Sequence, residues 1–517
     1  MRKIMVFIIL MLLISTTSIS VYGIDKNINR SNKEYSEYYS EPSKCLNQID
    51  EWPMFRHDLN HKGYSTSPAP GTNNTIWIYE TESSFESSPS VVNNKVYIGS
   101  LDSNVYCLDA ETGTKIWNYT TGLNIYFSSP AVTDGKVYIG SGDGNVYCLD
   151  ADTGMFIWSY QTDDLTWSSP SVFDGKVFIG SNDYNVYCLD ADTGGYIWSY
   201  TTGGFIQSSP AIVNGKVYIG SNDNNVYCID AETGTKIWNY TTDASVQSSP
   251  AIANGKVYVG SRGGNVYCID SETGTYIWSH KPGGQIDSSP AVFNDKVYFG
   301  SWNGNVYCLD AENGWRIWNY TAGSTIRFSS PAVADNKVYI GSYEDIVYCL
   351  DADTGTHIWS YTTGGYVWSS PAVSDDRVFI ASYDGNIYAF SDETQNSPDA
   401  PTIDGPTSGK IDISYNFSFN SVDPDEDDVY YYVKWGDGYI ENWEGPHPSG
   451  EDFEISHTYA IQSTFTIEAK AKDSYDAESN WSEFQITIPR TRTKTYLWYE
   501  WLLERFPMLD RLLNLLI

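Results

Sequence analysis

Short apolar runs separated by polar turns occupy most of the chain, and the same runs return at a fixed interval. One unit, residues 128–160, contains four such runs, and Asp134-Gly135 and Asp143-Gly144-Asn145 separate the first three. Asp-Gly between alternating apolar residues is a strong hairpin signal. The unit therefore predicts four antiparallel strands, A to D, at residues 130–132, 136–140, 146–149 and 156–160.

The tripeptide Ser-Ser-Pro marks eight copies of this unit, and its prolines are 40 or 41 residues apart. Four strands in roughly 40–50 residues are typical of one blade of a β-propeller. The eighth copy has no strand D with a tryptophan, whereas residues 75–79, ahead of the first copy, form such a strand around Trp77. We therefore predict an all-β fold with an eight-bladed β-propeller, in which residues 75–79 complete the last blade and close the ring.

The turn between strands C and D carries a family resemblance. Residues 107–117 (Cys-Leu-Asp-Ala-Glu-Thr-Gly-Thr-Lys-Ile-Trp) resemble the tryptophan-docking motif of pyrroloquinoline-quinone-type (PQQ-like) propellers, which include outer-membrane-assembly lipoproteins. The motif recurs seven times, and residues 52–58 are similar to the segment that precedes many such propellers. The resemblance covers residues 52–396. It implies the fold more than the function, because the family contains quinone enzymes, assembly factors and surface proteins without known catalysis.

A PQQ-dependent dehydrogenase is the enzymatic alternative. The resemblance implies that such enzymes carry adjacent cysteines, a calcium-bound carboxylate site and long inserted loops. This chain has no Cys-Cys pair, its repeats are uniformly short, and His57 and His61 lack a third ligand, so we interpret these histidines as loop residues. We expect no catalytic residue and no cofactor. An envelope-assembly factor is a further alternative, by family analogy alone.

Seven cysteines occupy one equivalent position, where the eighth blade has Ala389. A position that accepts cysteine or alanine favours a small buried side chain, on which a neighbouring tryptophan packs. One cysteine per blade is unsuited to disulfides, which require Cα atoms within roughly 7 Å. We therefore predict a packing role for Cys107, Cys148, Cys188, Cys228, Cys268, Cys308 and Cys349.

Two positions differ among the near-identical repeats: the residue before each Ser-Ser-Pro and the first residue of each B–C turn. Both belong to connections on one face of the predicted ring. Aromatic residues there are not required by the fold, and exposed aromatic residues with polar neighbours are typical of recognition surfaces. Packing beneath the loops, or neutral drift, explains them equally well. The predicted ligand-binding residues are Phe127, Trp167, Trp302, Phe328, Tyr343, Trp368 and Tyr383.

The N-terminus resembles a secretory signal peptide. Arg2 and Lys3 precede an apolar run at residues 4–14 and a small-residue end at Gly23, so residues 1–23 are the predicted signal and residues 24–51 a polar linker. The formal net charge of −34 disfavours nucleic acid as a partner. Sequons permit glycosylation at Asn29, Asn73, Asn118, Asn239, Asn319, Asn416 and Asn480.

After the repeats, residues 397–489 keep strand alternation without the 40-residue interval. Residues 435–438 (Trp-Gly-Asp-Gly) and 456–459 (Ser-His-Thr-Tyr) resemble two motifs of the polycystic-kidney-disease (PKD) domain, an immunoglobulin-like sandwich. That resemblance implies a spacer or adhesive role outside the cell. Asp423, Asp425, Glu426, Asp427 and Asp428 are compatible with calcium, but we interpret them as a solvated acidic turn.

Residues 490–517 form an amphipathic tail in which Pro507 separates two short apolar segments. We expect residues 495–517 to attach the chain to the surface, in the membrane interface or on an envelope partner; packing back on the sandwich is the alternative. Together these features predict a secreted or cell-surface binding scaffold. It would recognise protein or polysaccharide through one propeller face.

Overall fold

The computed structural model describes residues 50–392, 396–425, 427–474, 477–490 and Arg505. The predicted signal peptide, most of the linker and nearly all of the tail lie outside these residues. In the part of the chain that the structure describes, no helix is long and apolar enough to cross a membrane.

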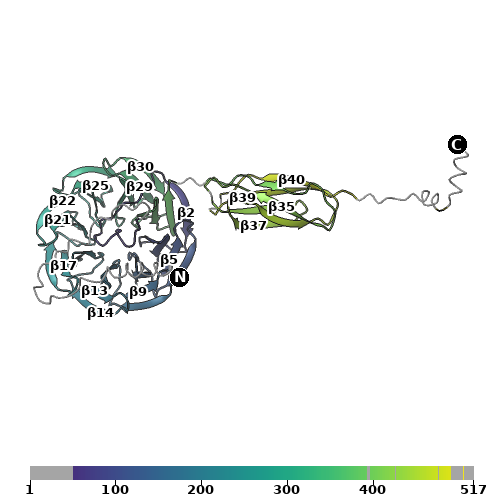
Figure 1. Ribbon diagram of the computed structural model, residues 1–517. Coiled ribbons are helices and arrows are strands. Elements are labelled where there is room, and N and C mark those ends of the chain that lie inside the picture. Colours follow the sequence, from purple (N-terminus) through teal and green to yellow (C-terminus); the bar gives the residue numbers. More distant parts are fainter. Residues whose placement is uncertain (1–49, 393–395, 426, 475–476, 491–504, 506–517) are drawn as a thin grey trace, which may run out of the picture. The chain divides into compact units, whose positions relative to one another are not determined.

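Residues 50–392 form a ring of eight antiparallel sheets (Figure 1). The second sheet follows the prediction closely, with β7 (Ala131–Thr133), β8 (Lys136–Gly140), β9 (Asn145–Asp150) and β10 (Phe156–Gln161). The first and last strands of the other six consecutive sheets are β3 (Ser90–Val92) and β6 (Lys115–Thr120), β11 (Ser171–Phe173) and β14 (Tyr196–Thr201), β15 (Ala211–Val213) and β18 (Lys236–Thr241), β19 (Ala251–Ala253) and β22 (Tyr276–His280), β23 (Ala291–Phe293) and β26 (Arg316–Thr321), and β27 (Ala332–Ala334) and β30 (His357–Thr362).

The last sheet is completed from the N-terminal side of the repeats. It contains β31 (Ala372–Ser374), β32 (Arg377–Ala381) and β33 (Asn386–Ser391), and its outer strand is β2 (Asn74–Glu80). β2 pairs antiparallel with β33, and Trp77 lies opposite Ala389. This pairing agrees with the predicted closure, in which the first strand of the repeat region supplies the missing strand D.

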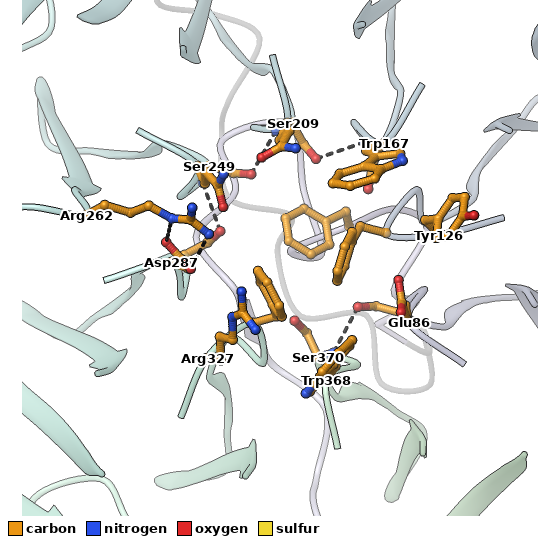
Figure 2. A pocket seen from close by; sticks show the side chains of 18 residues that line it. Glu86, Tyr126, Trp167, Ser209, Ser249, Arg262, Asp287, Arg327, Trp368 and Ser370 are labelled. Atoms are coloured by element: carbon orange, nitrogen blue, oxygen red, sulfur yellow. Dashed lines mark hydrogen bonds and ion pairs between the residues drawn. The ribbon is translucent and has the colours of Figure 1, made fainter. Parts of the chain in front are cut away.

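The second serine of each Ser-Ser-Pro links neighbouring blades. Its backbone N–H donates to the hydroxyl of the equivalent serine in the next blade at 2.8–3.0 Å, and the last blade donates back to the first. We call this closed circle the serine belt; Figure 2 shows part of it at Ser209 and Ser249. Its members are Ser88, Ser129, Ser169, Ser209, Ser249, Ser289, Ser330 and Ser370.

Replacing Ser209 with alanine tests the belt. The buried Ser169 N–H loses its acceptor at 3.0 Å, and an unsatisfied buried donor costs about 1–3 kcal/mol of unfolding free energy. Urea unfolding of the full chain measures the change. Ser159→Ala, on an exposed position of β10, is the matched control and is expected to stay within about 0.5 kcal/mol. Equal effects of the two substitutions would contradict a structural role for the belt.

In seven of the eight blades, a tryptophan of the outer strand donates a hydrogen bond to a backbone carbonyl of the following blade; Trp359 donates to Pro70 instead. Trp198 is buried, and its Nε1 donates to the carbonyl oxygen of Ala231 in the next blade at 3.1 Å. The indole lies against Gly234, whose φ of +69° favours glycine, and a Cβ there would lie 2.6 Å from the ring. Cys188 is the buried cross-strand partner of Trp198. All seven repeat cysteines are buried and free, as the predicted packing role requires.

Residues 50–67, the axial segment, run along the innermost strands of the ring. β1 (Tyr64–Ser65) within it pairs parallel with β27. Outside β1, the segment makes backbone hydrogen bonds to the innermost strands of six blades; Trp52 and Val91 exchange two, and each other pair shares one. These bonds join Trp52 to Val91, Pro53 to Val132, Leu59 to Ile212, Asn60 to Ile252, Lys62 to Val292 and Gly63 to Val333.

Two axial side chains are buried among the blades. Arg56 donates to the carbonyl oxygen of Pro290 at 3.0 Å and to that of Pro331, the prolines of two adjacent Ser-Ser-Pro motifs. His61 lies in a turn, as expected of a loop residue, but it is fully enclosed; burial and the nearby Arg56 lower its pKa to about 3. The loop interpretation therefore missed that this segment is part of the core.

Residues 396–490 form a separate β domain of two sheets. One contains β34 (Thr402–Asp404), β35 (Ser414–Asn420) and β38 (Phe453–Thr458). The other contains β36 (Val429–Lys434), β37 (Ile440–His447), β39 (Thr464–Lys472) and β40 (Ser482–Thr487). Residues of both sheets share one hydrophobic core.

The two motifs that suggested a PKD-like domain meet in this core. The Trp435 and His457 rings stack with centroids 4.5 Å apart, and His457 Nε2 lies 2.8 Å from Asp437 Oδ2. The prediction of a solvated acidic turn is wrong at Asp423. This side chain, in the loop between β35 and β36, is buried.

Candidate functional site: an axial pocket

A pocket of about 430 Å³ lies on the propeller axis (Figure 2). The residue before each Ser-Ser-Pro lines it in all eight blades, so the variable position identified in the sequence faces one shared cavity. Phe55 of the axial segment also lines the pocket. The eight variable residues are Glu86, Phe127, Trp167, Gln207, Gln247, Asp287, Phe328 and Trp368.

Aromatic rings form one side of this pocket. Phe127 meets Phe328 with ring centroids 4.6 Å apart and Trp167 at 5.5 Å. Trp368 lies 5.4 Å from Phe328 and 6.2 Å from Phe127. Two pairs of blades that are distant in sequence thus supply one continuous aromatic surface, which is half-buried rather than fully exposed as the sequence suggested.

The three predicted residues from the B–C turns extend this surface outward. Tyr383 and Tyr343 lie 5.1 and 6.1 Å from Trp368, measured between ring centroids. Trp302 joins through Arg327, whose guanidinium carbon lies 4.5 Å from the Trp302 ring. The structure therefore brings all seven predicted residues into one contact network, four in the pocket wall and three beside it. These residues also contact one another, as the alternative explanation of packing beneath the loops predicts.

The opposite side of the pocket is polar. Gln207 and Gln247 are half-buried neighbours in consecutive blades. In the next blade, Asp287 is held by Arg262 in a bidentate ion pair with distances of 3.0 and 3.1 Å. A buried aspartate with such a partner keeps a fixed position, so this pair shapes the wall and presents a neutral, polar surface to a ligand.

A second arginine is held without a carboxylate. Arg327 lies over the rings of Trp302 and Phe328, each at 4.5 Å, an arrangement that favours a cation. Among the described residues, no hydrogen bond or salt bridge of Arg327 is formed, and its buried Nε has no acceptor. This cation is therefore available to a polar or anionic group that enters the pocket.

Glu86 is the titratable group between the aromatic residues of the neighbouring blades. Its side chain is almost completely buried, and this burial raises its pKa to about 7, against the opposing attraction of Arg327. The carboxyl group is therefore partly protonated at neutral pH and offers both a donor and an acceptor. Three indole N–H groups in and beside the pocket also lack acceptors, those of Trp167, Trp302 and Trp368.

Sequence reasoning missed the charged residues and Phe55. Glu86, Asp287 and Arg262 occupy the same variable positions as the predicted aromatic residues, so variation among the repeats also marks these charged residues. The prediction included only the aromatic residues at these positions. Arg327 precedes one of those positions. Phe55 had no signal, because the axial segment lies outside the repeat.

The pocket residues do not fit a calcium-bound quinone. Glu86 is partly protonated near neutral pH and Asp287 is occupied by Arg262, whereas calcium in proteins takes 6–8 oxygen ligands that include ionised carboxylates. The repeat cysteines pack between the blades rather than in the pocket. Within the described ranges, the one cluster of acidic side chains with metal-like spacing lies in the C-terminal domain.

Comparison with known proteins supports the propeller fold. The family described as outer membrane protein assembly factor BamB matches residues 66–172 and 303–397, and the family described as beta-alanine-activating enzyme, beta-propeller, matches residues 137–338. No curated protein matches the chain.

Solved structures are similar at low identity. BamB from Moraxella catarrhalis is 18% identical with a TM-score of 0.56, covering 62% of this chain and 100% of its own. The quinohemoprotein alcohol dehydrogenase from Comamonas testosteroni is 17% identical with a TM-score of 0.56, covering 67% and 82%. The computationally designed Ika8 protein is 17% identical with a TM-score of 0.55, covering 62% and 100%. A catalyst, an assembly factor and a designed scaffold share the fold, so the matches identify a PQQ-like, BamB-like β-propeller and leave the activity to the site.

Proposed function

We propose that the chain is an exported, non-catalytic binding scaffold, secreted or held at the cell surface. It recognises a protein or polysaccharide whose chain end, side chain or sugar unit enters the axial pocket. The observation that carries the proposal is the convergence of all eight variable positions on one cavity. Its volume of about 430 Å³ falls in the range of roughly 300–1,000 Å³ that is usual for ligand pockets.

The pocket chemistry suits such a ligand. Flat aromatic faces stack with sugar rings or aromatic side chains, and the unpaired indole N–H groups need acceptors. Arg327 adds a cation for a carboxylate or another acceptor-rich group. In this proposal the eight sheets are an eight-bladed propeller, and residues 397–489 are a PKD-like, immunoglobulin-like spacer. The signal peptide and tail fulfil their predicted roles in export and attachment.

A binding screen with the full chain tests the proposal. Surface polysaccharides and peptides are screened by biolayer interferometry, and each ligand found is measured again with Trp167→Ala and Trp368→Ala. Because each substitution removes one stacking face, we expect at least tenfold weaker binding, about 1.4 kcal/mol. Trp315→Ala is the matched control, because Trp315 is 76% exposed and lies outside the pocket. Wild-type affinity in both pocket variants, or an equal loss in the control, would refute the proposal.

A further inference from the structure

The loop between β35 and β36 brings three carboxylates together. Asp423, Asp425 and Asp427 alternate along the chain, and each offers an oxygen within 4.8 Å of the others. Oxygens that bind one calcium ion at roughly 2.3–2.6 Å lie at most about 5 Å apart. The spacing of the three carboxylates therefore permits all of them to bind a single ion.

Asp423 is the fixed member of this cluster. Its side chain is 1% exposed, and Oδ1 accepts the backbone N–H groups of Asp425 and Asp427 at 2.8 and 3.3 Å. The other oxygen, Oδ2, is buried without a hydrogen-bond partner, and so is Oδ2 of Asp427. An anionic oxygen that is removed from water without a partner is costly, and a cation bound between these two atoms would offset that cost.

The ion pairs of the described residues do not offset this cost. Within the described part of the domain, no salt bridge reaches Asp423, Asp425 or Asp427. Asp473, after β39, is fully buried nearby. Asp423, Asp425 and Asp427 are thus gathered in one loop without a salt bridge from the described residues of the domain.

We propose that Asp423, Asp425 and Asp427 form a calcium site in the C-terminal domain. The ligand set consists of oxygens alone, which suits calcium rather than zinc, and alternate aspartates in one short loop are the arrangement that calcium loops use. This site replaces our interpretation of a solvated acidic turn. It is independent of the axial pocket and of the function proposed for it.

The site also reaches the start of the domain. The backbone N–H and side-chain amide of Asn396 donate to Asp425 at 2.6 and 3.0 Å. Asn396 lies only five residues after the end of β33 at Ser391. A bound ion that fixes Asp425 thereby also fixes the residue at which the linker enters the domain.

Calorimetric titration of the chelator-treated full chain with calcium chloride tests the proposal. We expect one site with a dissociation constant on the order of 0.1–1 mM, the range of extracellular calcium modules. Asp425→Asn/Asp427→Asn should weaken binding at that site at least tenfold. Asp404→Asn, at an exposed aspartate of the same domain, is the matched control and should bind as the wild type does.

Thermal unfolding provides an independent readout. Calcium should raise the unfolding temperature of the C-terminal domain in the wild type and in Asp404→Asn, but not in the double variant. Circular dichroism establishes that each variant is folded, and Asp425→Asn alone, at an exposed position, serves if the double variant is not. Absence of calcium binding, or unchanged affinity in the folded variant, would overturn the proposal.

Discussion

Replacing Trp198 with alanine is expected to lower the free energy of unfolding of the propeller by about 3–5 kcal/mol. The substitution removes a buried indole that fills the space between two blades. It also deprives the carbonyl oxygen of Ala231 of its donor at 3.1 Å. Gly234, on which the indole packs, has no side chain that could fill the resulting cavity. Urea unfolding followed by tryptophan fluorescence measures the loss.

Ile197→Ala supplies the control for this experiment. Ile197 is adjacent on the same strand, but it is 39% exposed and points away from the blade interface. We expect a change below about 1 kcal/mol. An equal loss from the two substitutions would mean that the indole contributes only its general hydrophobicity and that docking on the next blade adds no stability.

Replacing Glu86 with glutamine is expected to stabilise the chain at pH 8 by about 3 kcal/mol and to leave it unchanged at pH 4. Burial raises the pKa of Glu86 from its usual value of 4.5 to about 7, so the folded state favours the protonated form. The stability that Glu86 contributes is fully present below pH 4.5 and is lost as the pH rises through about 7. Glutamine keeps the size of the side chain and cannot ionise, so the variant lacks this loss.

Denaturant midpoints of both proteins from pH 4 to pH 8 measure the difference. Glu82→Gln, at an exposed position four residues earlier, serves as the control for the loss of a surface carboxylate. A constant offset between the wild type and Glu86→Gln across this range would show that the pKa of Glu86 is the same in the folded and unfolded chain, which would contradict the raised pKa.

Repetition made the propeller predictable. The interval of 40 or 41 residues locates every blade, and the misplaced tryptophan strand at residues 75–79 reveals how the ring closes. Both can be recognised in the linear sequence because the eight copies can be aligned with one another. The packing role of the cysteines followed in the same way, because alanine replaces them in one blade. Comparison among copies also identified the residue before each Ser-Ser-Pro, which lines the axial pocket in all eight blades.

The remaining features depend on contacts between residues that are distant in the sequence. Glu86 has a raised pKa because residues from seven other blades surround the same axis, and a linear sequence does not show such convergence. The sequence predicts His61 to be a loop residue because its partner Ser171 lies more than a hundred positions away. It gives no sign that Arg56 is buried, because the proline carbonyl groups that Arg56 contacts are even more distant. Asp423 belongs to a loop whose burial is decided by the packing of two sheets, so its acidic composition alone suggested exposure.

The serine belt has an evolutionary consequence. Its bonds use the backbone and hydroxyl of serines, and the side chain of the residue before each Ser-Ser-Pro takes no part in them. Mutations at that residue therefore change the cavity without opening the circle, so the eight codons can diverge separately while selection preserves the rest of each copy. The same separation makes the chain a host for directed evolution. A library randomised at these eight codons would sample new pockets on an unchanged propeller. The fraction of its members that still fold would measure how far folding and ligand binding depend on different residues.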